Sequence, residues 1–427
     1  MNDTPLRDRR LPLVLVLGVA VFVGSWFVIH HLFYALDHLR DTVEYARDAH
    51  GILVQGKVPY RDFPFEYPPL ALPVFLLPSL IAGRHFTGYQ ELFELMMAAF
   101  GIVILVSVAV TLAAQRIGTR RLLGAVAFVA VAPVLLGAVL LSRYDLLPAA
   151  LVSAALAAIV LDHRRTGFVL LALGTAAKAY PVVLVPIVAY YVWRRHGARK
   201  VVVCVALYFA VLLACFAPFF ALAPAGVWAA VHGQASRPPQ LESLASAVFL
   251  AAHQLAGIHV TLYFTHKSDN IDGHPAMWLA QMMSVTQLFA LLFVWISHAR
   301  GPATVQRLLT ASAAAVAAFI VFDRVLSPQY LIWLAGLVAV LPGRRGLIAI
   351  WLLAIAMWMT QIWYPLDFKE LKALAPIESW AVVGRDLLLL ALFGLLALGD
   401  VPFARIARLS GAGRGFGSRP LKGPVAP

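Results

Sequence analysis

Apolar segments of about 20 residues recur along the whole of this 427-residue chain, of which 61% is hydrophobic. A helix needs about that length to cross the hydrocarbon core of a bilayer, which is about 30 Å thick. The segments are too long and too continuously apolar for barrel strands, and lipid allows no other spanning structure than a helix or a closed barrel. The sequence therefore predicts an all-α polytopic integral membrane protein and argues against a soluble helical enzyme.

The segments predict twelve crossings with both chain ends on the same side of the membrane. They cover 11–32, 89–114, 121–140, 144–161, 167–180, 181–193, 201–221, 278–297, 304–322, 329–342, 346–364 and 380–399. The pair 167–193 is expected to form a hairpin with Lys178 at its tip. Residues 68–83 are apolar but short and contain four prolines, so we expect a juxtamembrane or re-entrant segment on the outer side.

The net charge of +13 follows this topology. On the N-terminal side lie 21 of the 34 Lys and Arg residues, whereas the opposite side holds 17 of the 21 Asp and Glu residues. Because positive charge gathers on the cytoplasmic side, we expect a multi-pass protein of the inner or plasma membrane with both termini in the cytoplasm. No nucleic-acid partner is implied by a charge excess distributed in this way.

The topology predicts three regions, the second of which contains two large outer loops. We expect a cytoplasmic N-terminus at 1–10, a retained first span, and a transmembrane domain at 11–400. A first outer loop with juxtamembrane segments occupies 33–88, and a large outer loop occupies 222–277. Residues 401–427 form a basic, Gly-rich tail that we expect to be disordered near the anionic inner leaflet.

Ionisable and polar residues gather at the outer ends of the predicted spans, where such groups usually have a function. Asp41, Tyr45 and Asp48 share one face of a helix, with Glu44 close to it. A carboxylate at the lipid boundary can take a proton from an attacking hydroxyl. Arginine binds phosphate through two parallel hydrogen bonds and lysine acts as a point charge, which makes three cations candidates for a phosphate site: Lys178, Arg237 and Arg324.

Several sequence blocks resemble, in the same order, those of the family 87 glycosyltransferases of the GT-C class. The first outer loop carries Asp41-x-x-x-Tyr45, Gly56-Lys-Val-Pro-Tyr60 and Tyr67-Pro-Pro69. The later blocks are Arg143-Tyr-Asp145, Lys178-x-Tyr-Pro181, Arg237-Pro-Pro-Gln-Leu-Glu-Ser243 and Ser327-Pro-Gln-Tyr330 with Trp333. The resemblance covers roughly residues 10–400, and the outer loop near 265–275 has no counterpart in it.

This resemblance implies a GT-C-like bundle that transfers a sugar, most often mannose, from a polyprenyl-phosphate donor to a hydroxyl of a glycolipid or polysaccharide at the outer membrane face. It places the general base of an inverting reaction on Asp41 and leaves Asp48 and Glu44 as alternatives. Lys178, Arg237 and Arg324 would hold the donor phosphate. Ten further residues would support substrate binding: Tyr45, Asp48, Tyr60, Glu66, Arg143, Asp145, Tyr180, Glu242, Gln329 and Tyr330.

We expect no metal and no other cofactor, because the leaving group already carries negative charge that two or three cations can balance. The segment Asp269-Asn-Ile-Asp272 is the alternative position for a divalent ion, although a solvated turn is the simpler interpretation. The two cysteines, Cys204 and Cys215, are eleven residues apart on one helix, or about 16 Å, and are too distant to form a disulfide.

Two other function classes remain open. A transporter or lipid flippase also contains broken helices and intramembrane charges, but its ionisable residues should lie near the midplane of two related halves. Here they gather at the outer ends, and no internal repeat is visible. A membrane scaffold with a decayed site is the third class, and the completeness of the blocks argues against it.

Overall fold

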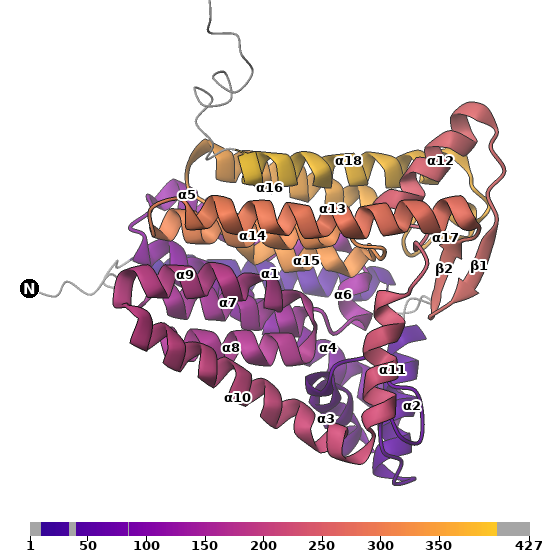
Figure 1. Cartoon of the computed structure of the whole chain (residues 1–427), viewed down its shortest axis with the longest axis horizontal. Coiled ribbons are helices and arrows are strands. Elements are labelled where there is room, and N and C mark those ends of the chain that lie inside the picture. The colour runs from indigo at the N-terminus through magenta and orange to yellow at the C-terminus, as the bar shows by residue number, and fades with distance from the viewer. Residues whose placement is uncertain (1–9, 34–39, 84, 399–427) are drawn as a thin grey trace, which may run out of the picture.

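The computed structural model describes residues 10–33, 40–83 and 85–398, which form a helical bundle (Figure 1). Within these ranges, seven helices have the length and apolar composition needed to cross a membrane. They are α1 (Leu11–Phe33), α4 (Phe86–Ala114), α5 (Thr119–Leu136), α10 (Ala198–Leu222), α13 (His274–Ala299), α16 (Gly343–Thr360) and α18 (Pro376–Leu398). The predicted cytoplasmic N-terminus, apart from Arg10, and the predicted basic tail lie outside the described residues.

Shorter helices complete the bundle. Those that lie alongside the long helices are α7 (Leu146–Val160), α8 (Arg164–Ala177), α9 (Val185–His196), α14 (Val305–Val321) and α15 (Leu331–Ala339). The 3₁₀ helices η3 (Tyr180–Leu184) and η4 (Pro328–Tyr330) precede α9 and α15. The predicted hairpin at 167–193 corresponds to α8, η3 and α9, with Lys178 between α8 and η3.

The remaining elements gather at one end of the bundle, at the right of Figure 1. They are α2 (Arg40–Leu53), η2 (Pro69–Ala71), α3 (Leu72–Ala82), α6 (Val139–Ser142), α11 (Pro224–Ala235), α12 (Leu244–Ala256), the strands β1 (Leu262–Thr265) and β2 (Ser268–Ile271), and α17 (Phe368–Lys372). An 11-residue helix such as α3 is about 17 Å long, too short to cross a core of about 30 Å.

The strands β1 and β2 lie in the predicted large outer loop, 222–277, and were not expected in an all-α protein. They pair antiparallel, with Thr265 opposite Ser268. The two turn residues, His266 and Lys267, have φ values of 51° and 55°. Positive φ at both central residues is typical of the tight turn whose twist matches that of a hairpin. The sequence signal was weak because neither residue is the Gly or Asn that usually occupies such a turn.

The opposite end of the bundle is basic. Arg10 donates to the hydroxyl of Thr119 at 3.1 Å, which joins the start of α1 to the start of α5. Arg121 donates to the carbonyl oxygens of Ala339 and Leu341 at 2.9 and 2.6 Å, which adds the end of α15. The turn from α9 to α10, which follows Arg194 and Arg195, lies at the left of Figure 1.

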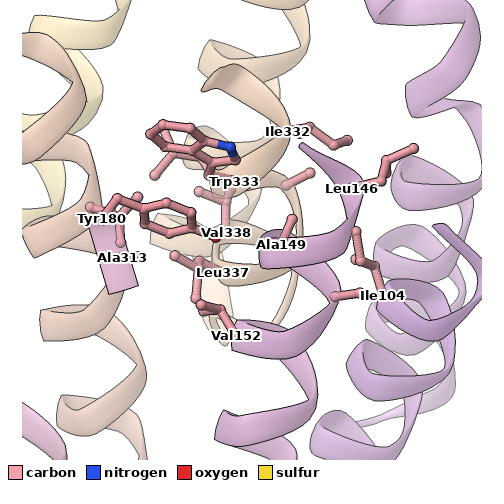
Figure 2. Packing of buried hydrophobic residues seen from close by; sticks show 14 of the residues in the cluster. Ile104, Leu146, Ala149, Val152, Tyr180, Ala313, Ile332, Trp333, Leu337 and Val338 are labelled. Atoms are coloured by element: carbon pink, nitrogen blue, oxygen red, sulfur yellow. The ribbon is translucent and has the colours of Figure 1, made fainter. Parts of the chain in front are cut away.

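The bundle has an apolar interior and an apolar exterior. Figure 2 shows the interior, where Ile104 of α4, Val152 of α7 and Leu337 of α15 pack below Tyr180 and Trp333. On the exterior, the most apolar windows of α10 and α13 are only 11% and 17% buried. Leu213 and Phe289, for example, are 67% and 64% exposed. Apolar surface of this extent on two long helices is typical of contact with lipid. Cys204 and Cys215 are both free, as expected.

Candidate active site

Asp41 lies in the first turn of α2 and forms an ion pair with Arg143, which follows α6. The carboxylate oxygen and the guanidinium nitrogen are 2.8 Å apart, and the side chains are 17% and 26% exposed. Tyr45 lies four residues after Asp41 on α2, and its buried ring stacks on Phe75 of α3 with ring centroids 4.1 Å apart. Packing on α3 and pairing with Arg143 therefore fix the start of α2 against the end of the bundle, with Asp41 still reached by solvent.

Lys178 forms a second, more deeply buried ion pair with Asp145, at 2.7 Å. The indole of Trp333 donates to the same carboxylate oxygen at 2.9 Å. The ammonium also lies over the rings of Tyr144 and Tyr330, at 4.9 and 5.2 Å from their centroids. The lysine is therefore held by one carboxylate in an aromatic enclosure, and that enclosure favours a cation.

Three aromatic rings stack beside this pair. Tyr180 and Tyr330 lie parallel to Trp333, with centroids 4.2 and 4.0 Å away. Among the described residues, the hydroxyl of Tyr180 and the side-chain carbonyl of Gln329 are buried without a hydrogen-bond partner. A buried polar atom without a partner costs free energy, so such atoms are candidate contacts for a ligand. Tyr180 belongs to the aromatic stack beside Lys178, and Gln329 directly precedes Tyr330 of that stack in the chain.

Arg237 and Arg324 lie together where the large outer loop meets the start of η4. Arg237 donates to the carbonyl of His266 at 2.7 Å and to the hydroxyl of Ser268 at 3.0 Å. Arg324 donates to the hydroxyl of Ser284 at 2.9 Å and to the carbonyl of Arg237 at 3.1 Å. These acceptors are neutral oxygens that orient the two guanidinium groups, while the carboxyl of Asp323 interacts electrostatically with both arginines.

Three further acidic residues of the first outer loop, Glu44, Asp48 and Glu66, interact with Lys267 at the β1–β2 turn. Glu44 pairs with that lysine at 2.9 Å. The pKa of Asp48 is raised, mainly by burial and further by the charges of Glu44 and Glu66. The positive charge of Lys267 opposes this change. These three carboxylates therefore link the β1–β2 turn to α2 and to the segment that follows it, through the charge of Lys267. Tyr60 supports the same loop by donating its hydroxyl to the carbonyl of Tyr67.

Glu242 was predicted as a site residue, and it belongs to a buried network that also contains Arg385 and Asp386, which were not predicted. One carboxylate oxygen accepts from the indole of Trp363 at 2.7 Å, and the other accepts from Gln240 at 3.0 Å. Arg385 of α18 donates to the carbonyl of Glu242, lies over the Trp363 ring at 5.1 Å, and pairs with Asp386 at 2.6 Å. Burial raises the pKa of Glu242, although Arg385 opposes the change. A charged pair inside the apolar α18 segment was the signal that could have identified Arg385 and Asp386.

The alternative metal position does not assemble several ligands. Asp269 pairs with Lys372 at 3.1 Å, and Asp272 accepts from the backbone N–H of Gly273 at 2.7 Å. Among the described residues, no group of three or more His, Cys, Asp or Glu side chains lies in a position to hold a metal ion together.

The predicted residues thus come from six separate parts of the sequence and meet at one end of the bundle. Two ion pairs, Asp41–Arg143 and Asp145–Lys178, are joined through the consecutive residues 143–145. Tyr180, Gln329 and Tyr330 adjoin the second pair, while Glu44, Asp48 and Glu66 form a separate cluster at Lys267. No family model matches the chain, and no curated protein matches it.

Asp323, between α14 and η4, gives the site a testable dependence on pH. Burial raises the pKa of its carboxyl from the usual 3.8 to about 6, although the backbone N–H groups of Arg324 and Val325 lower it. Because folding raises this pKa, the contribution of Asp323 to stability is complete below about pH 3.8 and is lost as the pH rises through about 6. Replacing the carboxyl in Asp323→Asn should therefore increase the stability of the folded protein most at neutral pH.

The free energy of unfolding of wild type, minus that of Asp323→Asn, should fall by about 1–3 kcal/mol between about pH 4 and pH 7. Thermal unfolding in detergent at each pH measures this difference. Asp62→Asn is the matched control, because its neighbour Arg61 lowers the pKa of Asp62 to about 2 and that residue does not titrate in this range. A stability difference for Asp323→Asn that is constant with pH would contradict the prediction.

Proposed function

We propose that this chain is an integral membrane glycosyltransferase that resembles the family 87 enzymes and moves a sugar, mannose in the first instance, from a polyprenyl-phosphate donor to a hydroxyl of a glycolipid or glycan. The observation that carries this proposal is the meeting of five separated sequence blocks at one end of the bundle. They bring a solvent-reached carboxylate, a lysine and Arg237 to the same end, and Arg324, which shortly precedes the last block, lies beside Arg237.

In the proposed reaction, Asp41 accepts the proton of the acceptor hydroxyl while the hydroxyl oxygen attacks the anomeric carbon. The bond from that carbon to the phosphate oxygen breaks, and its electron pair leaves with the lipid phosphate. Attack opposite the leaving group inverts the anomeric centre. Lys178, Arg237 and Arg324 would stabilise the charge that develops on the phosphate, a role for which Arg and Lys are well suited.

The remaining predicted residues would position these groups. Arg143 orients Asp41, and Asp145 orients Lys178, through the ion pairs described above. The unpartnered oxygens of Tyr180 and Gln329 would hydrogen-bond to the sugar. Stacked aromatic rings such as Trp333 and Tyr330 would contact the sugar or the polyprenyl chain.

This function implies the topology that the charges predict. Twelve crossings would place both termini in the cytoplasm and the site at the outer face of the cell membrane, where the polyprenyl chain of the donor can remain in lipid. Asp41 and Lys178 would then both lie at the level of the lipid headgroups.

The buried Arg385–Asp386 pair within α18 is the feature that favours the transporter or flippase alternative, because ionisable residues inside a span often line a transport path. The contacts of Arg385 with Glu242 and Trp363 give this pair a structural role at the base of the large outer loop. We therefore place the transporter or flippase second to the glycosyltransferase.

Purified protein in liposomes, given radiolabelled polyprenyl-phosphate mannose and a crude lipid extract, tests the proposal. We expect the label to appear in a new glycolipid, with transfer persisting in excess chelator. Movement of the labelled donor across the bilayer without a new product would support a flippase. No product with mannose or with other sugars on the same carrier would refute the glycosyltransferase.

A further inference from the structure

The end of the bundle opposite the candidate active site contains a basic pocket. It lies between the α7–α8 turn and the first turns of α10 and has a volume of about 600 Å³. Because Asp145 begins α7 and Asp162 follows it, this pocket is one helix length, about 22 Å, from the Lys178 pair. It is therefore separate from the site described above.

Four cationic side chains line this pocket: Arg164, Arg165, Arg199 and Lys200. Asp162 is the one carboxylate among its lining residues, and it pairs with Arg164 at 2.9 Å and with His196 at 2.9 Å. The pocket consequently carries an excess of positive charge. The first turns of α8 and α10 also lie at the pocket, and their backbone N–H groups favour an anion.

An apolar groove of about 450 Å³ continues from the basic pocket and shares two of its lining residues, His163 and Thr166. Val106 and Val110 of α4 line one wall, and Ala154, Ala158 and Leu161 line the other. From Leu161 to Ala154 the groove follows α7 for about 10 Å toward the middle of the bundle. Small alanine side chains leave this space open between the helices.

We propose that this pocket and groove bind an anionic glycerophospholipid, with its phosphate among the four cations and an acyl chain along the groove. Basic pockets between helices at a membrane surface suit such headgroups. A soluble phosphate would use the basic pocket alone and leave the groove without a role, whereas a lipid accounts for both. The proposal requires that the chain lies in a bilayer and does not depend on glycosyl transfer.

The test uses the purified full-length chain in phosphatidylcholine nanodiscs that contain a minor fraction of phosphatidylglycerol. Lipid that copurifies after transfer to detergent is measured by native mass spectrometry. We expect wild type to retain phosphatidylglycerol in preference to phosphatidylcholine. The double variant Arg165→Gln/Arg199→Gln should reduce that preference about 30-fold, given about 1 kcal/mol for each basic residue.

The matched control is Arg194→Gln/Arg344→Gln, which removes the same charge from exposed residues at the same end that do not line the pocket. An equal loss in both double variants would mean general surface attraction and would overturn the proposal. Ala158→Phe, which blocks the groove and leaves the cations in place, should reduce lipid retention without affecting the binding of inorganic phosphate. Retention unaffected by Ala158→Phe, with phosphate competing fully, would instead indicate a soluble anion site and overturn the lipid proposal.

Discussion

Asp41→Asn should reduce the rate of sugar transfer by about 100- to 10,000-fold, the usual contribution of a general base. Asparagine keeps the size of the side chain and can still accept a hydrogen bond from Arg143, but it cannot accept the proton of the acceptor hydroxyl. We therefore expect the loss in kcat, with the KM for the donor nearly unchanged. The measurement is a steady-state assay of labelled product with purified protein.

The control for this variant is Asp62→Asn, which makes the same chemical change in the same outer loop. Among the ion pairs described, Asp62 pairs only with its neighbour Arg61. Loss of the Asp62 carboxylate should therefore leave kcat within about twofold of the wild-type value. Full activity in Asp41→Asn, together with a large loss in Asp48→Asn or Glu44→Gln, would move the base to the cluster at Lys267.

Lys178→Ala should both abolish transfer and lower stability. Asp145 is 2% exposed, and removing its cation leaves a buried carboxylate whose remaining side-chain hydrogen-bond donor, within the part of the chain that the structure describes, is the Trp333 indole. Breaking a buried ion pair by removing one partner costs about 3–5 kcal/mol. Thermal unfolding in detergent should therefore show a clear drop, whereas Lys178→Arg, which keeps the charge, should lose less in both stability and donor binding.

A double variant separates the two roles of this lysine. In Lys178→Met/Asp145→Asn both charges are gone, while the amide oxygen can still accept from Trp333. We expect most of the lost stability to return and the activity to remain absent, because nothing then replaces the cation at the phosphate. Recovery of transfer along with stability would show that Lys178 only supports the fold.

The sequence predicted the helices well where apolar periodicity was long and uninterrupted. The predicted span 11–32 corresponds to Leu11–Phe33, and 201–221 lies within Ala198–Leu222. The hairpin of β1 and β2 was not predicted, since two strands of four residues joined by His266 and Lys267 have little periodicity and no glycine or asparagine turn signal.

The pairing of the site residues could not be predicted from local pattern. Asp41 and Arg143 are about a hundred residues apart in sequence, and only tertiary packing places their side chains at 2.8 Å. The same holds for Arg237, which we expected to face a phosphate and which the structure also uses to hold the β1–β2 turn. The contacts of Arg385 and Trp363 with Glu242 were missed because both residues lie in predicted spans, whereas Glu242 lies in the large outer loop, 143 and 121 residues earlier in the chain.

The most direct test of the proposed donor site at Lys178 is to locate the bound donor on the protein. A polyprenyl-phosphate mannose analogue with a photoreactive group next to the phosphate would be crosslinked to the purified chain, and its adducts mapped by mass spectrometry. We expect adducts on the peptides that carry Tyr144, Lys178 and Tyr330, and we expect natural donor to suppress them by competition. Competed adducts confined to the basic end near Arg164, or no competed adducts at all, would contradict the proposed donor site.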